Sequence, residues 1–373
     1  MSGIYIHIPF CKQACHYCNF HFSTSLKQKD DLIASIVKEI ELTTTFTTKK
    51  EVINTLYFGG GTPSILTIED LSLLLDSLKN KFVFSDTIEI TLEANPDDIS
   101  NDRLQKWKSI GINRFSVGIQ TLVEQELRWM NRAHTAKEAT ECIDKIKQAG
   151  FNNFSIDLIY GSPLLSNEDW MKNVHFFINK KVPHISCYAL TVEPKTALDK
   201  MIVQKKKEAV STDKQAEQFD LLVRWMKAAG YEQYEISNFA IPGFRSNHNS
   251  SYWQGKPYYG FGPSAHSYDG IKRRWNIANN ALYIQALQNN QIPFEEEILT
   301  TTQQLNEYIM TSLRTIEGLD LAHVSTIFGE KLATEIRIKS TKWGDKIIIT
   351  NSIIALTDTG KFFADGIAAD LFF

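Results

Sequence analysis

Two patterns of hydrophobic and polar positions alternate along residues 4–230. Short runs rich in apolar and β-branched residues predict strands, and longer runs with apolar residues three or four positions apart predict helices. The predicted strands are 4–8, 55–58, 87–92, 114–119, 153–159 and 184–190. The predicted helices are 30–42, 67–82, 100–110, 135–149, 167–179 and 212–229. Six strand-then-helix units predict a parallel sheet with helices outside it.

The ends of the predicted helices carry matching local signals. Ser100 stands where an N-cap residue is expected, and Gly150 and Gly230 follow two helices at the position where glycine commonly ends them. Six units predict an α/β fold with a partial (β/α)6 TIM-like barrel rather than a closed eight-stranded one. A doubly wound open sheet is the alternative layout.

The alternation stops at residue 231. Residues 231–275 contain eleven aromatic residues, about twice what the chain average of 11% gives, together with many Gly, Asn and Ser residues. We therefore expect loops held by aromatic anchors. Further on, helices are predicted over 303–315, 320–327 and 331–342, strands over 346–350 and 352–356, and then a last helix. That order predicts a small winged-helix-like α+β unit.

These patterns predict three segments. They are a core domain over 1–235, an aromatic-rich connecting segment over 236–300 and a C-terminal domain over 301–373. Residues 303–373 carry seven Lys and Arg against nine Asp and Glu. Binding to phosphates needs net positive charge, so DNA binding by the winged-helix-like unit is disfavoured. A structural or partner-docking role is the better interpretation.

Composition and charge exclude several classes of protein. With 43% hydrophobic and 22% charged residues among 373, the chain is neither disordered, nor collagen-like, nor a small disulfide scaffold. Forty Lys and Arg against 43 Asp and Glu give a net charge of −3, so no global positive field favours nucleic acid. The sequence lacks an apolar run of the ~18 residues that a membrane span needs and a basic secretory signal at its start. We expect a cytoplasmic protein.

Five cysteines fall into two groups. Cys142 and Cys187 lie alone in apolar segments and are expected to be buried and structural. Cys11, Cys15 and Cys18 form a C-x3-C-x2-C cluster, and thiolates this close are usually kept together by a metal. The spacing favours an iron–sulfur cluster with one iron left open. A zinc site with a histidine as fourth ligand is the alternative.

Polar residues follow the predicted strands at the ends where parallel β/α folds place their sites. They are the Gly59-Gly60-Gly61-Thr62-Pro63 run, Glu93, Gln120 with Arg132 beyond it, and Asp157. Buried strands are otherwise nearly all apolar, so these side chains predict one ligand that spans the mouth of the barrel. The glycines let a ligand approach the backbone, although a tight turn would also explain them.

Three motifs together resemble those of the radical S-adenosylmethionine superfamily. They are Tyr5-Ile6-His7-Ile8-Pro9-Phe10-Cys11, Cys15-His16-Tyr17-Cys18 and the glycine run ending in Thr62-Pro63. More narrowly, nearly the whole chain is similar to the group that contains the HemN-type oxygen-independent coproporphyrinogen III oxidases and the HemW-type heme chaperones.

The resemblance implies a [4Fe–4S] cluster on Cys11, Cys15 and Cys18. Its fourth iron would bind the amino and carboxylate groups of S-adenosylmethionine, and an electron from the cluster would cleave the sulfonium to methionine and a 5′-deoxyadenosyl radical. The family positions that contact this cofactor match Tyr5, Tyr17, Gly60, Gly61, Thr62, Glu93, Gln120, Arg132 and Asp157.

The resemblance also separates the two subgroups. HemN-type decarboxylases carry a further cysteine two residues after the third and a longer N-terminal segment, whereas this chain has Phe20 there and its first cluster cysteine at position 11. The run His248-Asn249-Ser250-Ser251-Tyr252-Trp253 resembles the H-N-x-x-Y-W motif of the HemW type. His248 would ligate heme iron, and Tyr252 and Trp253 would offer flat apolar faces. A hydrogen bond from His248 to a loop carbonyl is the alternative.

The resemblance therefore implies a heme chaperone that binds heme and passes it to acceptors such as respiratory proteins. It further implies an electron donor such as a flavodoxin or ferredoxin, a homodimer, and association with the inner face of the membrane through partners. Two rival functions are an oxidase that decarboxylates coproporphyrinogen III and a zinc-stabilised, DNA-binding protein.

Overall fold

The computed structural model describes residues 2–45 and 51–373. Its centre is a twelve-stranded sheet whose middle six strands are parallel neighbours in chain order. These strands are β1 (Ser2–Ile8), β2 (Val52–Gly60), β3 (Val83–Ala94), β4 (Arg114–Gln120), β5 (Phe154–Tyr160) and β6 (His184–Ala189). In a doubly wound sheet the strand order reverses at a switch point. Six strands in unbroken order confirm the partial barrel and exclude that alternative.

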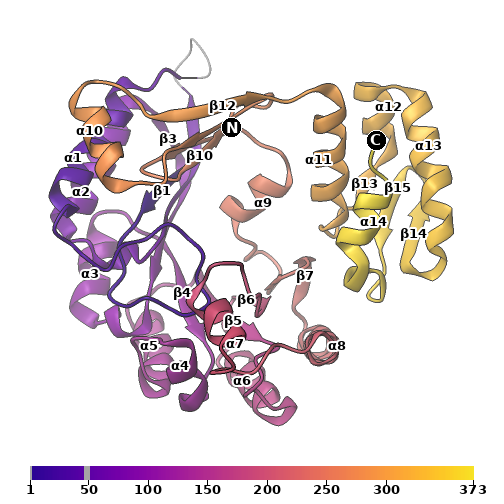
Figure 1. Cartoon of the computed structure of the whole chain (residues 1–373), viewed down its shortest axis with the longest axis horizontal. Coiled ribbons are helices and arrows are strands. Elements are labelled where there is room, and N and C mark those ends of the chain that lie inside the picture. Colours follow the sequence, from indigo (N-terminus) through magenta and orange to yellow (C-terminus); the bar gives the residue numbers. More distant parts are fainter. Residues whose placement is uncertain (1, 46–50) are drawn as a thin grey trace.

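Helices connect the parallel strands and lie along the outer side of the sheet (Figure 1). They are α1 (Lys29–Leu42), α2 (Ile68–Lys81), α3 (Asn101–Ser109), α4 (Glu124–Met130), α5 (Ala136–Gln148) and α6 (Asn167–Asn179). After β6, the last parallel strand, the chain forms α7 (Ala197–Val203) and α8 (Thr212–Ala228). Short 3-10 turns cover Pro63–Ile65 and Pro96–Asp98. The Ser100 side chain caps α3 by accepting from the Arg103 N–H at 3.3 Å. Gly150 and Gly230 have positive φ just after α5 and α8, as predicted.

The expectation of loops over residues 231–275 is wrong. This segment and its continuation form β7 (Glu232–Glu235), β8 (Asn238–Ala240), α9 (Asn247–Trp253), β9 (Tyr258–Phe261), β10 (His266–Tyr268), β11 (Lys272–Asn276), α10 (Asn280–Gln288) and β12 (Phe294–Ile298). The strands span only three to five residues. Such short runs hold too few positions to show a period of two, and α4 and α7 escaped prediction because each has only seven residues.

These short strands extend both edges of the parallel sheet. Strand β9 pairs parallel with β1, and β10, β11 and β12 follow it in antiparallel order. At the other edge, β8 and β7 add antiparallel to β6. One hydrophobic core runs through the sheet and its helices from Ile4 to Leu287. The aromatic residues of the segment anchor it there, because Phe239, Tyr259 and Phe261 are fully buried.

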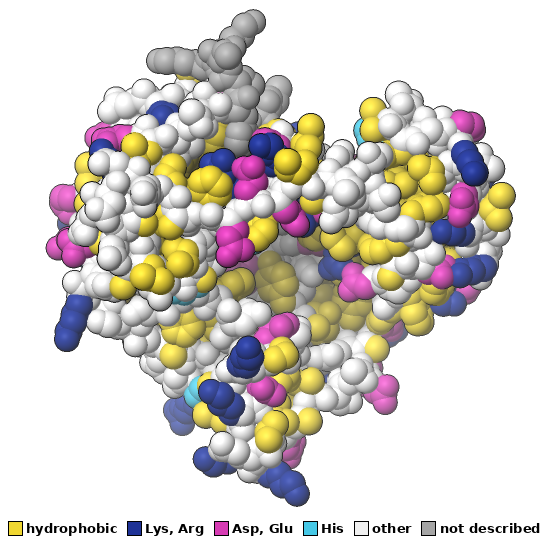
Figure 2. All heavy atoms as spheres, turned by 45° about the horizontal axis from the view of Figure 1, so that its top comes forward, with side chains coloured by type: hydrophobic (Ala, Val, Ile, Leu, Met, Phe, Trp, Pro, Cys, Tyr) yellow, Lys and Arg dark blue, Asp and Glu magenta, His cyan; other side chains and the backbone are white. Residues whose placement is uncertain are grey.

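The C-terminal part has its own hydrophobic cluster, from Leu305 to Leu371. It contains α11 (Thr301–Leu313), β13 (Leu319–Asp320), α12 (Leu321–Phe328), α13 (Glu330–Ser340), β14 (Ile347–Thr350), β15 (Ile353–Leu356) and α14 (Ala364–Asp370), with 3-10 turns at Thr341–Lys346 and Gly360–Phe363. The predicted helices and hairpin are present. Figure 1 shows this part in yellow beside the sheet, and Figure 2 shows the surface hollowed between the two. We keep the three predicted segments as a proposal for the domain division.

Among the described residues, no helix combines the length and the apolarity that crossing a membrane would require.

Candidate cluster and cofactor site

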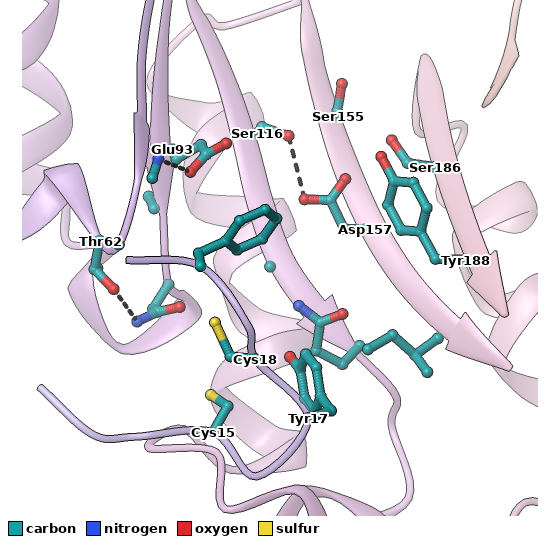
Figure 3. Close-up of a pocket in the computed structure, with 18 of the residues that line it drawn as sticks. Cys15, Tyr17, Cys18, Thr62, Glu93, Ser116, Ser155, Asp157, Ser186 and Tyr188 are labelled. Carbon is teal, nitrogen blue, oxygen red and sulfur yellow. Dashed lines mark hydrogen bonds between the residues drawn. The ribbon is translucent and has the colours of Figure 1, made fainter. Parts of the chain in front are cut away.

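A cavity of about 570 Å³ opens at the carboxyl ends of the six parallel strands. The three cysteines of the motif line it, and so does every residue predicted to contact S-adenosylmethionine. These lining residues are Cys11, Cys15, Cys18, Tyr5, Tyr17, Gly60, Gly61, Thr62, Glu93, Gln120, Arg132 and Asp157. Figure 3 shows Cys15 and Cys18 on their loop, across the cavity from Asp157 and Tyr188 on the strands. Folding thus brings the whole predicted set around one space.

The cysteine loop begins where β1 ends and closes on itself through backbone hydrogen bonds. The N–H of Cys11 donates to the Ser23 carbonyl at 3.0 Å, and the N–H of Ser23 donates to the Pro9 carbonyl at 2.9 Å. The N–H of Cys18 donates to the Cys15 carbonyl at 3.3 Å. These bonds hold the backbone from which the three thiols face the cavity.

Residues after α4 hold the middle of the loop. The Asn131 side chain donates to the Ala14 carbonyl at 2.7 Å and accepts from the Gln13 side chain at 2.7 Å. The His16 N–H donates to the Met130 carbonyl at 3.0 Å. Asn131 has φ of 59°, a left-handed conformation that asparagine tolerates better than most residues. The loop is therefore anchored to the end of α4 as well as to β1.

The chemistry of these thiols fits a metal cluster. Burial raises the pKa of Cys11 to about 11 and also raises the pKa of Cys18. Both thiols are then protonated at neutral pH until a metal displaces the protons. Within residues 2–45 and 51–373, no three His, Cys, Asp or Glu side chains gather around the place of one metal ion. A four-iron cluster would be held by Cys11, Cys15 and Cys18 through separate irons, so these thiols need not surround one point.

Arg132 lies beside the cysteines, and not all of the hydrogen-bond donors of its guanidinium group have a partner. Its Nη1 is 3.3 Å from the Cys15 Sγ, and its Nη2 donates to the Asn95 side chain and the Gly118 carbonyl, both at 2.7 Å. Its buried Nε has no hydrogen-bond partner in the described part of the chain. A buried cation with a spare donor next to a metal-binding loop suits an anionic group such as a cofactor carboxylate.

The glycine run serves the protein's own packing as well as any ligand. A Cβ on Gly61 would lie 2.6 Å from the Phe10 carbonyl oxygen, and a Cβ on Gly60 would lie 2.6 Å from the His7 ring. Gly60 also has φ of 107°, where side chains are strained. The tight-turn interpretation therefore holds for both glycines, and both still line the cavity. Thr62 accepts from the Asn95 side chain at 3.4 Å (Figure 3).

Two half-buried carboxyl groups, those of Glu93 and Asp157, face the same cavity. Burial raises the pKa of Glu93 to about 7, although Tyr57 donates to its Oε1 at 2.8 Å and the Gly60 N–H donates to its Oε2 at 3.2 Å. Burial also raises the pKa of Asp157, whose Oδ2 accepts from Ser116 at 3.3 Å. Neither carboxyl group forms an ion pair with a described side chain. Both suit the hydroxyl or amino groups of a polar ligand.

His248 and Tyr252 also line the cavity, from α9. The His248 Nδ1 is 2.9 Å from the Thr55 Oγ1, and its Nε2 is 2.9 Å from the Tyr252 hydroxyl, so the predicted alternative of a loop carbonyl partner is wrong. Burial lowers the pKa of His248 to about 3, which keeps the ring neutral at physiological pH. Trp253 is absent from the cavity lining, and its ring lies 5.5 Å from the Arg314 guanidinium instead.

Sequence reasoning missed several residues of this site. Glu89 accepts from the N–H groups of Asn247 and His248, at 3.2 and 3.1 Å, and thereby positions the start of α9. Arg114, almost fully buried, lies 3.9 Å from Glu89 and donates to Ser155. A signal for some of these residues was present, because Glu89, Ser116, Ser155 and Ser186 are polar residues within otherwise apolar strands.

Comparison with known proteins agrees with this geometry. Residues 5–177 match the model of the radical SAM superfamily. The heme chaperone HemW of Bacillus subtilis is 32% identical over 369 residues, which cover 98% of this chain and 97% of that protein. The chain belongs to the HemW family of the radical SAM superfamily. A second HemW-family relative, the heme chaperone HemW of Lactococcus lactis, is 33% identical and covers 85% of this chain and 83% of its own length.

A solved structure shows the same fold as this HemW-family chain. Coproporphyrinogen III oxidase (HemN) of Escherichia coli superposes with a TM-score of 0.84 over 99% of this chain and 89% of that one, at 21% identity. This likeness confirms the predicted α/β architecture. Membership of the radical SAM superfamily implies a [4Fe–4S] cluster and S-adenosylmethionine, and the thiols and the unpaired Arg132 donor fit them.

Proposed function

We propose that this protein is a heme chaperone that binds heme, a [4Fe–4S] cluster and S-adenosylmethionine, and that transfers heme to respiratory proteins. The observation that carries the proposal is the position of His248 and Tyr252, from the H-N-x-x-Y-W run, in the wall of the cavity that Cys11, Cys15 and Cys18 also line. The relatives named heme chaperone HemW, which match 98% of the chain in one case, support the same function.

The cluster and cofactor are assigned to this chain's own residues. We propose that the three cysteines hold the cluster and that Arg132 and Glu93 orient S-adenosylmethionine, with Tyr5, Tyr17, Gly60, Gly61, Thr62, Gln120 and Asp157 around it. When bound, this pair supplies one-electron chemistry that the protein alone lacks. The neutral His248 ring adds no charge beside it.

Heme binding requires a local rearrangement in α9. Both nitrogens of the His248 ring are hydrogen-bonded in the structure, to Thr55 and to Tyr252. Iron ligation needs one of them free. The bond to the Tyr252 hydroxyl is the one to break, because Tyr252 lies on the same short helix and lines the cavity, whereas Thr55 lies within β2. We propose His248 Nε2 as the ligand, with the ring of Tyr252 beside the porphyrin, whereas Trp253 lies outside the cavity lining and is left out of the site.

Heme titration of His248→Ala tests the ligand. Heme affinity is expected to fall about tenfold or more, because loss of an axial ligand leaves only apolar contacts, while iron and sulfide content stays unchanged. Tyr252→Phe is the matched variant, since it keeps the aromatic face and frees Nε2, and its heme affinity is expected to equal or exceed that of the unmodified protein. An identical titration curve for His248→Ala would remove His248 from the site.

Coproporphyrinogen III decarboxylation is the second function to test. The fold similarity to HemN favours it, whereas Phe20 stands at the position of the further HemN-type cysteine and is 66% exposed at the cavity mouth. Anaerobically reconstituted protein is supplied with coproporphyrinogen III, S-adenosylmethionine and a reductant. We expect no protoporphyrinogen above background, and robust turnover would overturn the chaperone assignment in favour of the oxidase.

The proposed function requires an electron donor and heme acceptors. We propose a flavodoxin or ferredoxin as electron donor, respiratory proteins as heme acceptors at the inner face of the membrane, and a cytoplasmic location. A homodimer through the cysteine-loop face is proposed as the resting form, which size-exclusion chromatography of the reconstituted protein tests directly.

A further inference from the structure

A lysine-rich segment covers the outer side of the cysteine loop. Residues 195–207, which include α7, contain five lysines and one acidic residue, Asp199. The lysines are Lys195, Lys200, Lys205, Lys206 and Lys207, of which the first four are exposed. The ion pairs of the neighbouring helices α6 and α8 involve other residues, and no described acidic side chain pairs with these five lysines. The positive charges of the four exposed lysines are therefore directed to solvent.

The one acidic residue inside the segment is already engaged. Asp199 Oδ2 accepts from the Lys195 N–H at 2.9 Å, and the Asp199 N–H donates to the Thr196 hydroxyl at 3.2 Å. These bonds close the first turn of α7. Glu193 and Glu208 flank the segment, so the concentration of positive charge is confined to residues 195–207. The chain as a whole carries a net charge of −3, which makes this segment a local exception.

Direct contacts tie the segment to the loop between Cys15 and Cys18. The Leu198 N–H donates to the His16 carbonyl at 2.7 Å. The Lys207 Nζ is 2.8 Å from the His16 Nδ1 and lies 4.1 Å from the centre of the Trp129 ring. Leu198 and Tyr17 also share one apolar cluster. Leu198 and Lys207 thus hold the lysine-rich segment against the loop that carries Cys15 and Cys18.

The remaining basic residue of the loop does not add to this charge. Lys12 is paired with Asp97 at 2.7 Å and with Asp98 at 2.5 Å, so its charge is neutralised. Figure 1 places α7 in the lower part of the molecule.

We propose that residues 195–207 form the docking surface for an acidic one-electron carrier protein that reduces the cluster. This inference rests on the proposed function only in requiring the cluster. The step transfers one electron, so the carrier is oxidised by one electron and the cluster is reduced by one electron, and no bond or proton moves. Opposite charges on the two surfaces steer the encounter and orient the carrier towards the cysteine loop.

The segment fits a protein partner better than an anionic membrane. An interfacial membrane helix needs a long apolar face opposite its basic face. Helix α7 has only seven residues, and within 195–207 only Val203 is a strongly exposed large hydrophobic residue. Charge without an apolar stripe is typical of a transient, electrostatically steered protein contact.

Charge reversal tests the surface in the full chain. Lys195→Glu, Lys205→Glu and Lys206→Glu are combined in one variant, and Lys79→Glu, Lys181→Glu and Lys331→Glu in a control with the same net charge. The probe is reduced flavodoxin mixed with reconstituted protein in a stopped-flow instrument, with bleaching of the cluster absorption as readout. At low ionic strength we expect the second-order rate constant for cluster reduction to fall about tenfold or more in the segment variant only. This difference from the unmodified protein should become smaller as salt is added.

Two further readouts separate the outcomes. Reduction by dithionite, which needs no docking, is expected to be equal in all three proteins, and calorimetric binding of oxidised flavodoxin to metal-free protein is expected to weaken in the segment variant alone. Equal rate losses in both variants would overturn the proposal. It would also be overturned if the segment variant lost binding to phosphatidylglycerol vesicles and kept normal flavodoxin kinetics. The segment variant is expected to bind heme as the unmodified protein does. If none of the three proteins bound heme, the proposed chaperone function would be wrong, but the docking surface would not be affected.

Discussion

Tyr57 connects the two halves of the cavity through a single side chain. Its ring stacks on His248 at 5.0 Å and on Tyr5 at 6.1 Å, and its hydroxyl donates to Glu93. The residue proposed for heme and the carboxyl group proposed for the cofactor therefore contact the same ring. No motif pointed to Tyr57, because an alternating aromatic residue in a strand is usually core.

We expect the binding of S-adenosylmethionine to depend on pH through the protonation of Glu93. Burial raises the pKa of Glu93 to about 7, and the bond from Tyr57 opposes that rise because it stabilises the carboxylate. If the carboxylate is the form that binds S-adenosylmethionine, affinity falls as the pH drops through about 7. Tyr57→Phe removes the bond, raises the pKa further, and is expected to weaken binding about tenfold at neutral pH.

Equilibrium dialysis of S-adenosylmethionine against reconstituted protein from pH 6 to about 9 checks this prediction. Tyr57→Phe should regain affinity at the alkaline end, which a purely structural defect would not do. Tyr160→Phe is the control, because that buried ring keeps its packing outside the cavity lining. A pH-independent loss in Tyr57→Phe would show that Glu93 does not bind as the carboxylate.

At the scale of elements, one carboxyl group joins helix α1 to the extension of the sheet. Glu39 on α1 accepts from the Gly262 N–H at 2.8 Å, from the Asn276 side chain at 2.6 Å and from the Tyr283 hydroxyl at 2.5 Å. These partners lie after β9, on β11 and on α10, more than 220 residues further along the chain. Strand β9 pairs with β1, so this contact supports the strand that leads into the cysteine loop.

Glu39→Gln is expected to flatten the dependence of stability on pH. Burial raises the pKa of Glu39 from 4.5 to about 7 in the folded protein. The folded state therefore holds the Glu39 proton more tightly than the unfolded state does. The stability that this proton contributes is fully present below about pH 4.5 and is lost as the pH rises through about 7. Its size is on the order of 3 kcal/mol at most.

Urea unfolding midpoints at a series of pH values measure this effect. The unmodified protein is expected to lose stability between about pH 5 and pH 8 relative to Glu39→Gln, which cannot titrate at this position. Two parallel curves would mean that Glu39 has an ordinary pKa in the folded protein.

At the scale of the whole molecule, hydrogen bonds and ion pairs join the C-terminal part to the sheet. Backbone bonds link Ile236 to the Arg314 carbonyl at 3.1 Å and Ile316 to the Tyr234 carbonyl at 3.0 Å. Arg245 bridges both sides, since it pairs with Glu232 on β7 at 2.8 Å and with Glu317, just before β13, at 2.6 Å. Arg245 lies two residues before the start of α9, which carries His248.

Arg245→Ala is expected to loosen this junction without unfolding either part. The two ion pairs are partly exposed, so the loss of stability should stay near 1 kcal/mol. Hydrogen exchange should rise in residues 301–320 and stay unchanged in β1–β6. Arg224→Ala, which removes an exposed pair within α8, serves as the control. Equal exchange in both variants would mean that Arg245 does not hold the junction.

The sequence by itself determined what depends on neighbouring residues. The six strand-helix units, the Ser100 cap and the glycine stops after α5 and α8 follow from patterns a few residues long, and Cys142 and Cys187 are buried as expected. Motif residues were also found from sequence, because polar side chains interrupt apolar strands at one edge. The cavity lining brings those residues together as predicted.

Only the tertiary structure decided which distant segments meet. Pairing of β9 with β1, the partners of Glu39, and the placement of His248 against Thr55 and Tyr57 join residues about 190 to 260 positions apart. Local periodicity carries no information about such pairs, because the free energy that selects them comes from burying whole surfaces together. For the same reason, the lysines of residues 195–207 became a surface over the cysteine loop only when the chain was folded.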